Sequence, residues 1–390
     1  MMNIFFLIFL LFFKLNIDLK KMQKNTLQMN LDSFFKTNNQ RKQVFYIDWN
    51  SENPSAKWLL KKPKNISFSA MVKWTHIGDI IICSEDRHNP EISLNKEKLN
   101  IINSKSFDDN LQLLSFIKSH LQKSIRRQKY IEALKSAKEM LLLDKNAFLR
   151  RISIIMFEDV KLKKYFINFI WLMVACSKGY NLQDYHLDFI FKYIYDLCLE
   201  NEFDDYNPED ERILKSSVDK FIDKVNINKK ISEENKDILY CIGLRISYGG
   251  MGGDIDMLCF YAMKYFYFFE KGNNIKNIDI NGCKNITSKF VFDFKFEKIE
   301  DFLYQGVDFH CFPGIIKDIK EETDYKYSDE QLKKCIWEYN SKINTRKNND
   351  VNEKEISNIK NIWEEIKTIL LKHQKIILGM MLNKIKELNY

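Results

Sequence analysis

Apolar side chains recur every three or four residues from about position 110 onward, the spacing that places them on one face of an α-helix. The stretch Leu111–Val160 predicts three helices joined by short turns, with a break at Asp144–Asn146. Their stripes are Leu114, Ile117, Leu121 and Ile125; Tyr130, Leu134, Ala137 and Leu141; and Leu149, Ile152, Met156 and Val160. The nearly continuous apolar run Tyr165–Ser177 predicts a buried helix.

The same periodicity predicts more helices in the rest of the chain. They are expected at Asp184–Glu200, Pro208–Val225, Ser232–Ser247, Asp254–Glu270, Ser328–Ile343 and Glu353–Leu388. Pro208 suits a first helical turn, where a backbone N–H is not needed. The acids after Ser232 suit the positive end of a helix dipole.

Strands are predicted where β-branched and aromatic residues are dense, at Val44–Asp48, Ile66–Trp74 and Ile77–Cys83. The segment Trp49–Pro63 between the first two predicts a structured loop. One more strand is predicted near position 290, where phenylalanines alternate with other residues: Phe290, Phe292, Phe294 and Phe296.

These elements predict a mostly α fold with a small N-terminal β-containing unit and a short strand-rich insertion. The expected segments are an apolar leader at 1–21, the β-containing unit at 22–105, a helical domain at 106–270, the insertion at 271–315 and C-terminal helices at 316–390. The leader's apolar run is shorter than the roughly 20 residues that span a bilayer, and it lacks a basic start and a small-residue cleavage site. Three interpretations stay open: a poor signal or anchor, a buried segment, or residues ahead of a start at Met22.

Composition changes this picture little. The formal net charge of +8 permits a polyanionic partner, but it is below the balance expected of a dedicated nucleic-acid binder. Abundant Lys, Asn, Ile and Phe indicate an AT-rich genome, so part of the lysine excess need have no function. The 8 Cys show no CxxC spacing and mostly lie in apolar runs. They predict buried thiols in a reducing compartment.

Paired charges mark the centre of the chain, Leu121–Val160. Arg126–Arg127 and Arg150–Arg151 precede the acidic pair Glu158–Asp159, which ends an apolar run. Burying an unpaired carboxylate is costly, so one of the four arginines is expected to pair with an acid. Either the charges form a structural network that fixes the helices, or Lys123, Arg126 and Arg127 face a phosphate while the acids hold the helix in place.

The order of motifs in this stretch is Leu121-Gln-Lys-Ser-Ile-Arg126, Ala133–Ala137, Arg150-Arg151-Ile152 and Glu158-Asp159-Val160. It resembles the helical C-terminal region of the replication-associated recombination ATPases, the MgsA/RarA and Werner-helicase-interacting-protein family. The similarity extends over about residues 110–270, at most two fifths of the chain. It implies a helical collar that drives oligomerisation within DNA-replication machinery.

The ATPase activity of that family is not expected here. Its phosphate-binding loop needs GxxxxGK[ST], and the chain contains no Gly-Lys dipeptide. Lys161 also stands where the family has the glycine that follows its acidic pair. We therefore expect no cofactor, and the sequence does not favour an enzyme.

A glycine cluster in Ser247–Asp254 contains Gly249, Gly250, Gly252 and Gly253. Their backbone N–H groups can form an anion-binding nest at the start of the next helix. The alternative is a turn between helices with close backbone packing. It is favoured because Asp254 suits the N-cap position and would repel a phosphate.

The loop Asp308–Cys311 brings an acid, His310 and a thiol together in sequence. A metal site needs three or four ligands, and no second Cys/His cluster has suitable spacing, so no metal is expected. Cys–His catalysis requires the two side chains to meet in space, which adjacency does not ensure. A packed loop over the helical core is favoured. Cys83 with His88 is a weaker candidate still.

Trp49, Trp58 and Trp74 lie among lysines of the β-containing unit. They either stack on the bases of a single-stranded ligand or form an aromatic core with a lysine-rich edge. The core is favoured, because the chain has no RNP, KH or zinc-knuckle pattern.

Three hypotheses on function result. The first is a non-enzymatic helical protein of nucleic-acid transactions, a replication or repair assembly factor whose partners are copies of itself, DNA, or replication and repair proteins. The second is a scaffold without nucleic-acid contact, and the third is an enzyme that uses Gly249–Asp254 or Asp308–Cys311. The expected location is intracellular, in cytoplasm or nucleus. It changes to the secretory pathway or a membrane anchor if residues 1–21 act as a signal.

Overall fold

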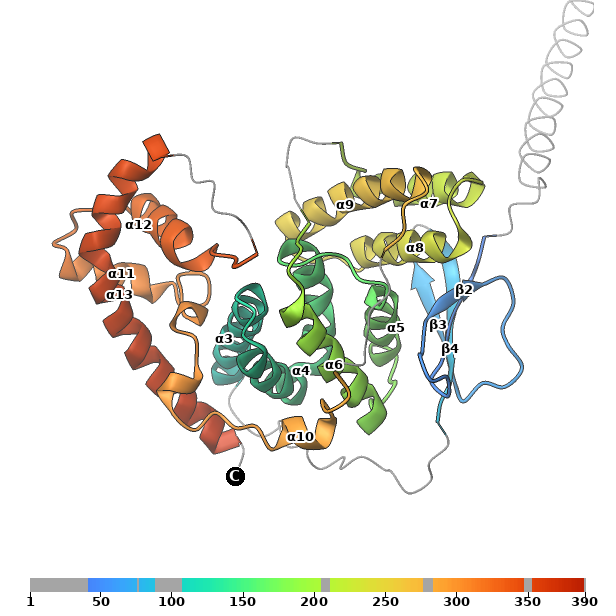
Figure 1. Ribbon diagram of the computed structural model, residues 1–390, viewed down its shortest axis with the longest axis horizontal. Coiled ribbons are helices and arrows are strands. Elements are labelled where there is room, and N and C mark those ends of the chain that lie inside the picture. The colour runs from blue at the N-terminus through green and yellow to red at the C-terminus, as the bar shows by residue number, and fades with distance from the viewer. Residues whose placement is uncertain are drawn as a thin grey trace, which may run out of the picture.

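The computed structural model describes residues 41–75, 77–87, 107–204, 211–275, 283–346 and 353–388. They form a mostly helical structure with one four-stranded sheet, as predicted. In Figure 1 the sheet lies at one end, residues 107–275 form the middle, and residues 314–388 form the opposite end. The predicted leader, 1–21, lies outside the described residues.

The sheet consists of β1 (Val44–Asp48), β2 (Lys57–Leu59), β3 (Phe68–Trp74) and β4 (Gly78–Glu85). Its order is β2-β1-β4-β3, with β1 and β4 parallel in the centre and antiparallel strands at both edges. The three strands predicted in the N-terminal unit are confirmed to within two residues. The loop predicted at Trp49–Pro63 is partly wrong, because it contains β2. This strand forms by pairing with β1, as in Phe45 opposite Trp58, which a local pattern does not reveal.

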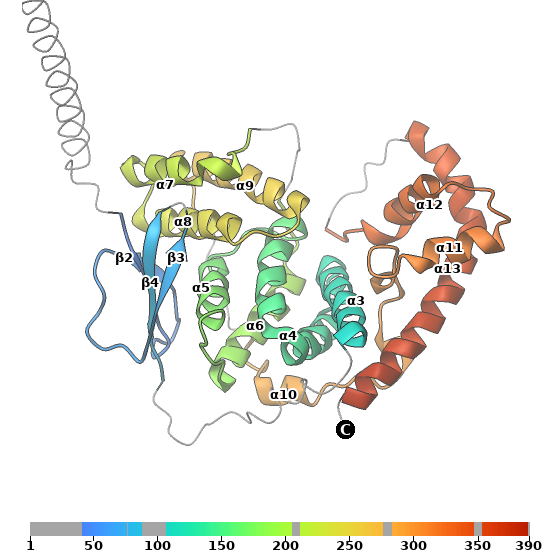
Figure 2. The same ribbon diagram turned by 180° about the vertical axis from the view of Figure 1, so that it is seen from behind.

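One face of the sheet packs against α5 (Phe166–Cys176) and α8 (Glu233–Ser247), as Figure 2 shows from behind. Trp49, Trp58 and Trp74 are all buried in this layer. The indole N–H of Trp58 donates to the Cys241 thiol at 3.4 Å, and that of Trp74 to the Ser247 hydroxyl at 2.8 Å. The three tryptophans therefore form a core. The alternative that these rings stack on nucleic-acid bases is wrong, because all three are buried against helices.

The central pair is α3 (Phe107–Arg126) and α4 (Tyr130–Glu158), which share the most extensive helix–helix contact among the described elements. Asp144 interrupts α4 with a non-helical backbone at φ −158° and ψ 98°. Its carboxylate accepts the N–H groups of Asn146 and Ala147, both at 2.9 Å, and so caps the second half. The predicted break is thus present, although the three predicted helices are two, the second of them kinked.

The other helices of the middle are α6 (Asp184–Leu199), α7 (Val218–Ile227) and α9 (Gly252–Glu270). The start predicted at Pro208 lies outside the described residues, and residues 211–214 are not helical, so the helix begins only at Val218 after a 3₁₀ turn. The predicted start of α8 at Ser232 is confirmed, and the Ser232 side chain caps the helix by accepting the N–H of Asn235.

The strand predicted at Phe290–Phe296 is wrong. Residues Ser288–Phe292 form the short helix α10, in which the Thr287 side chain accepts the N–H of Phe290 as an N-cap. Phe290 is exposed, whereas Phe296 is buried and stacks on Phe302 with ring centroids 4.1 Å apart. The alternation of phenylalanines therefore reflects separate contacts rather than two faces of a strand.

The C-terminal part contains α11 (Gly314–Glu322), α12 (Asp329–Ile336), a π-helical turn (Trp337–Ser341) and α13 (Glu353–Leu388). Arg346, between the last two, fastens this part to the middle. Its guanidinium donates to five backbone carbonyls, those of Ile125, Arg126, Asp159, Leu197 and Glu200. These carbonyls lie at the C-terminal ends of α3, α4 and α6, where a positive charge is favourable.

One cluster of buried hydrophobic side chains runs from the sheet through the middle helices to α13. None of the helices in the described ranges is both long enough and apolar enough to cross a membrane.

Candidate functional site

Arg126, at the end of α3, is the centre of a buried ion-pair network. Its Nη2 lies 3.1 Å from Glu158 Oε1, and its Nε donates to Asp159 Oδ1. The second carboxylate oxygen of Asp159 accepts from Gln122 at 2.8 Å. The remaining nitrogen of Arg126 donates to the backbone carbonyl of Ser341 at 2.6 Å. The prediction that an arginine pairs with Glu158 or Asp159 is confirmed, because Arg126 pairs with both.

Lys123, one turn earlier on α3, forms a second buried pair with Asp308. Lys123 Nζ and the Ser341 hydroxyl both donate to Asp308 Oδ2. Oδ1 accepts the backbone N–H of His310 at 2.9 Å and lies 3.3 Å from its Nδ1. Burial alone would raise the pKa of Asp308, but the contacts with His310, Lys123 and Ser341 hold it well below its usual value. Asp308 is thus fixed as a carboxylate.

The residues predicted to face a phosphate, Lys123, Arg126 and Arg127, do not present free cations to solvent. The first two are buried in the pairs just described. Arg127 donates to the backbone carbonyls of Lys123 and Asn340, and burial together with the charge of Arg126 lowers its pKa to about 10. The segment at Asn340–Ser341 covers this end of α3, so the geometry matches the structural interpretation of the network.

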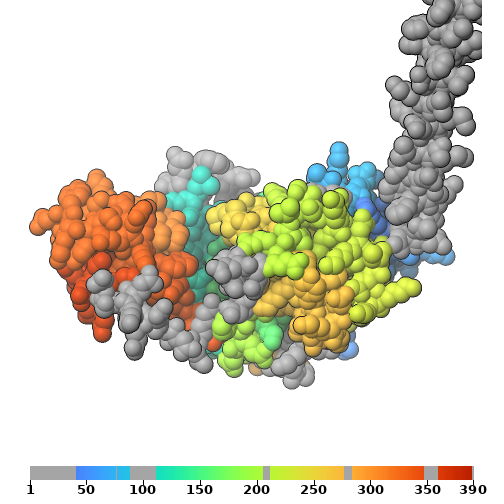
Figure 3. All heavy atoms as spheres, turned by 90° about the horizontal axis from the view of Figure 1, so that it is seen from above, coloured from blue at the N-terminus to red at the C-terminus, as the bar shows by residue number. Residues whose placement is uncertain are grey.

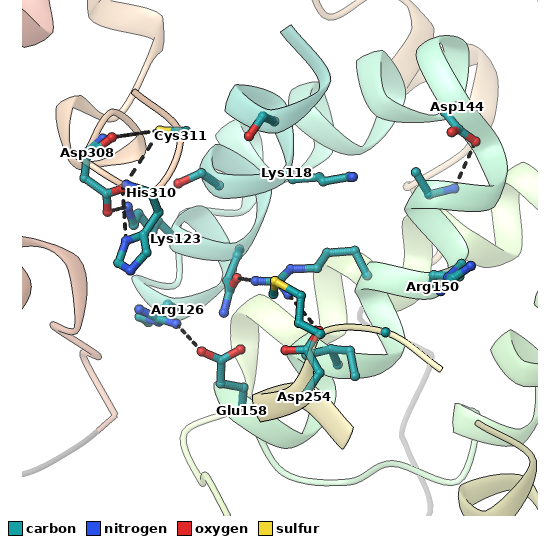
Figure 4. Close-up of a pocket in the computed structure, with 18 of the residues that line it drawn as sticks. Lys118, Lys123, Arg126, Asp144, Arg150, Glu158, Asp254, Asp308, His310 and Cys311 are labelled. Atoms are coloured by element: carbon teal, nitrogen blue, oxygen red, sulfur yellow. Dashed lines mark hydrogen bonds and ion pairs between the residues drawn. The ribbon is translucent and has the colours of Figure 1, made fainter. Parts of the chain in front are cut away.

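A cavity of about 740 Å³ lies beside the network. It is walled by one face of α3, the second half of α4, the loop before α9, and the loop Asp308–Cys311 (Figure 4). In Figure 3 the teal surface of α3 and α4 is visible between the orange C-terminal residues and the yellow residues near position 250. The fold therefore brings the central arginines, the glycine loop and the Asp308–Cys311 loop to one cavity, although the last two are about 50 residues apart along the chain and the first lie farther away still.

Arg245 of α8 is the most deeply buried cation of this cavity, at 2% exposure. Its guanidinium donates to the Ser153 hydroxyl at 2.8 Å and to the carbonyls of Gly249 at 2.8 Å and Arg150 at 3.2 Å. All three acceptors are neutral. Burial and repulsion by Arg150 lower its pKa to about 10, so the site holds a buried cation at an energetic disadvantage.

Three more cations, Lys118, Arg150 and Arg151, line the same cavity as Arg245. Burial lowers the pKa of Lys118, and the charges of Arg151 and Arg150 lower it further against the opposing effect of Asp144. Arg150 is exposed and has a long 3.5 Å contact with the carbonyl of Gly249. We call Lys118, Arg150, Arg151 and Arg245 the cationic cluster.

The carboxylates that line the cavity do not balance this cluster. The lining contains six cationic side chains and four carboxylates, which leaves two positive charges. Asp308 and Glu158 are taken by Lys123 and Arg126. Of the other two, Asp144 caps the second half of α4, and Asp254 lies 3.7 Å from Arg151.

The excess charge therefore lies in the cationic cluster. In the part of the chain that the structure describes, no carboxylate is in ion-pair contact with Lys118, Arg150 or Arg245.

The glycine loop contributes to the cavity differently from the predicted nest. Gly249 and Gly250 adopt φ of +73° and +155°, which side chains disfavour, and the Gly249 carbonyl accepts from Arg245 and Arg150. Gly252 and Gly253 already belong to the first turn of α9. The expectation that Asp254 is the N-cap is wrong. Met251 occupies that position, and the Asp254 carboxylate lies 3.7 Å from Arg151.

In the Asp308–Cys311 loop only His310 offers an accessible chemical group. Burial and the charge of Asp308 raise the pKa of the Cys311 thiol to about 11, so it is not a nucleophile near neutral pH. The His310 side chain is 54% exposed and its ring is 5.6 Å from that of Trp337. Among the described residues no three His, Cys, Asp or Glu side chains are grouped to hold a metal. His88, the weaker candidate's second member, lies outside them.

Sequence reasoning missed Lys118, Arg245 and Trp337 as site residues. Two signals pointed to Lys118 and Arg245. The polar residues Ser115, Lys118, Ser119, Gln122, Lys123 and Arg126 recur at helical spacing along one face of α3. Arg245 is a lone cation in the apolar run Ile238–Ile246, where a buried charge needs a reason.

Comparison with known proteins returned no matching family model, no similar curated protein and no similar solved structure.

Proposed function

We propose that the cavity binds a small anionic molecule through a phosphate group, which lies against the cationic cluster. The observation that carries this proposal is the charge of Arg245. It is almost completely buried and has only neutral hydrogen-bond partners, and the repulsion by its neighbours Arg150 and Arg151 is opposed only in part by the charge of Asp254. An anion would remove that repulsion, because an opposite charge nearby favours the charged form of each group.

A phosphate fits the cluster better than a single carboxylate does. The cavity has two excess positive charges, and a phosphate monoester carries about two negative charges at pH 7. Three members of the cluster are arginines, whose planar guanidinium groups donate pairs of hydrogen bonds to phosphate oxygens. Arg150 and Lys118 keep part of their side chains accessible for such contacts.

This proposal differs from the nucleic-acid assembly factor predicted from the sequence. The contacts predicted for nucleic acid are engaged in internal pairs, whereas the cationic cluster lies inside a cavity, where a single phosphate group is reached more readily than a continuous strand. Binding to DNA, assembly with replication or repair proteins and self-association are therefore alternatives to test beside it. Each of the eight cysteines is a buried thiol, which supports a reducing, intracellular location for the proposed activity.

Calorimetric titration with inorganic phosphate and pyrophosphate at low ionic strength tests the proposal. We expect binding of both, weakened at least tenfold by Arg150→Ala, which removes an exposed member of the cluster without emptying the core. Arg41→Ala is the control, because Arg41 pairs with Asp223 near the sheet and is not part of the cavity lining. Its affinity should equal that of the wild type.

Absence of binding by either anion, or equal weakening by both substitutions, would overturn the proposal. A single-stranded oligonucleotide is titrated in parallel. Tight, salt-sensitive binding of the oligonucleotide without binding of pyrophosphate would instead favour the nucleic-acid hypothesis.

A further inference from the structure

Resting on the proposed phosphate site, we infer that the ligand is a nucleotide, whose flat base packs against Trp337 and His310 on the opposite side of the cavity. Figure 4 shows His310 and Arg150 on opposite sides of the cavity, with Lys118 between them. Trp337 lines the cavity next to His310, with the two ring centroids 5.6 Å apart. The two sides therefore differ in chemistry, one cationic and one aromatic.

The size of the cavity calls for more than a phosphate. A water molecule takes about 30 Å³ in the liquid, and a phosphate group occupies the space of only a few waters. The cavity measures about 740 Å³, which is in the range of pockets that hold whole cofactor-sized ligands. A phosphate on the cationic cluster would leave most of this volume to the rest of the ligand.

Trp337 is well placed to receive an aromatic ring. It is 38% exposed, whereas Trp49, Trp58, Trp74 and Trp171 are all buried. The His310 ring meets it at an interplanar angle of 71°, so the two rings form a corner rather than a closed stack. An aromatic face left open in a cavity favours a flat ligand ring, and nucleobases stack on such side chains with little sequence preference.

The wall between the two sides is polar. Ser115 and Ser119 of α3 line the cavity with hydroxyl groups, which both donate and accept hydrogen bonds. Glu158 adds a carboxylate that remains partly accessible beside its pair with Arg126. Sugar hydroxyls between a phosphate and a base match such a wall. The lining thus offers cations, hydroxyls and aromatic rings, the groups that a nucleotide requires.

Titration with adenosine monophosphate, uridine monophosphate and ribose 5-phosphate tests this inference. We expect both nucleotides to bind at least tenfold more tightly than ribose 5-phosphate, because only they have a base. Trp337→Ala should reduce the nucleotide affinities to that of ribose 5-phosphate and leave ribose 5-phosphate itself within twofold. Trp337→Phe, which keeps an aromatic face, should retain most of the nucleotide affinity.

The outcomes separate this inference from the proposed function. If all three phosphates bind equally and Arg150→Ala weakens each, the phosphate site stands and the nucleotide assignment is wrong. Equal weakening of nucleotides and ribose 5-phosphate by Trp337→Ala would also overturn it, since Trp337 would then act on the fold rather than on the base. If none of the three phosphates binds, the proposed function fails and this inference fails with it.

Discussion

The two sides of the cavity contain similar side chains in opposite states. On one side Lys123 and Arg126 are buried, and each is matched by a carboxylate, Asp308 and Asp159. On the other side the cationic cluster has Arg245 just as deeply buried, yet its acceptors are a hydroxyl and two carbonyls. On the first side, which we call the matched side, carboxylates balance the cations, whereas the lining of the cationic side has an excess of positive charge.

The difference shows how to separate structural charges from functional ones. Removing one partner of a buried ion pair leaves the other charge uncompensated, which is strongly destabilising. Removing one of several cations that repel each other leaves no such defect. Position in a patterned stretch does not distinguish the two cases, since Arg126 and Arg150 both lie in the same central segment. What distinguishes them is whether the hydrogen-bond partners of the buried cation are carboxylates or neutral groups.

The largest expected effect is on the matched side. Arg126→Ala leaves Asp159 buried without its cation and should lower the free energy of unfolding by about 3–5 kcal/mol. Arg150→Ala, its counterpart in the cationic cluster, should change it by no more than about 0.5 kcal/mol. Urea denaturation followed by circular dichroism measures both values. Similar losses in the two variants would remove the distinction between the sides.

The loop that supplies Asp308 depends on a second buried group, His120. Its Nδ1 is 2.6 Å from the Ser136 hydroxyl, and its Nε2 accepts the N–H of Leu303 at 2.8 Å. A Cβ on Gly306 would lie 2.7 Å from the His120 ring, so the two elements are in close contact. Burial and the charge of Lys123 lower the pKa of His120 to about 3.

This pKa predicts that acid lowers the free energy of unfolding of the protein through His120. Because the folded pKa is below the unfolded value of about 6.5, the unfolded chain binds the extra proton as the pH falls. The contribution of His120 is complete above about pH 6.5 and declines toward pH 3, by at most about 1.4 kcal/mol per pH unit. In His120→Gln the free energy of unfolding should decline less steeply between pH 6 and 4, by up to about 1.4 kcal/mol per pH unit, because one fewer proton is taken up on unfolding.

Denaturant midpoints at several pH values give the slopes. An identical slope in His120→Gln and wild type would show that His120 is not the group that titrates.

Much of the fold was predictable because long helices repeat their apolar stripe many times. The bounds of α13 agree with those predicted, and α5, α6 and α8 agree within one residue. Short elements were not predictable in the same way. The strand β2 exists through pairing with β1, and α10 through the local cap of Thr287, and neither contact has a periodic signal.

The candidate site was predictable only in pieces. The central arginines, the glycine loop and the Asp308–Cys311 loop were each recognised, but as separate candidates. Their meeting depends on how α3, α4 and α8 pack and on where the chain near position 310 returns, which no local pattern states. The state of each charge depends on the same packing, so the sequence left open whether Lys123 and Arg126 face a phosphate or pair with carboxylates, as they do.

The smallest expected effect comes from a substitution that places a carboxylate beside the cationic cluster. Met251 lines the cavity, is 64% exposed and occupies the N-cap of α9, so an acid there would lie beside the cationic cluster. Asp and Asn are equally good N-caps, so the difference between Met251→Asp and Met251→Asn reports charge alone. We expect Met251→Asp to be the more stable by about 0.3–1 kcal/mol at low salt, with the difference reduced in high salt.

Met251→Asp should also bind pyrophosphate more weakly than Met251→Asn does, because its carboxylate neutralises part of the positive charge that would attract the ligand. If the two variants are equally stable and bind pyrophosphate equally, the excess positive charge on this side of the cavity is already compensated, and the contrast between the two sides is lost.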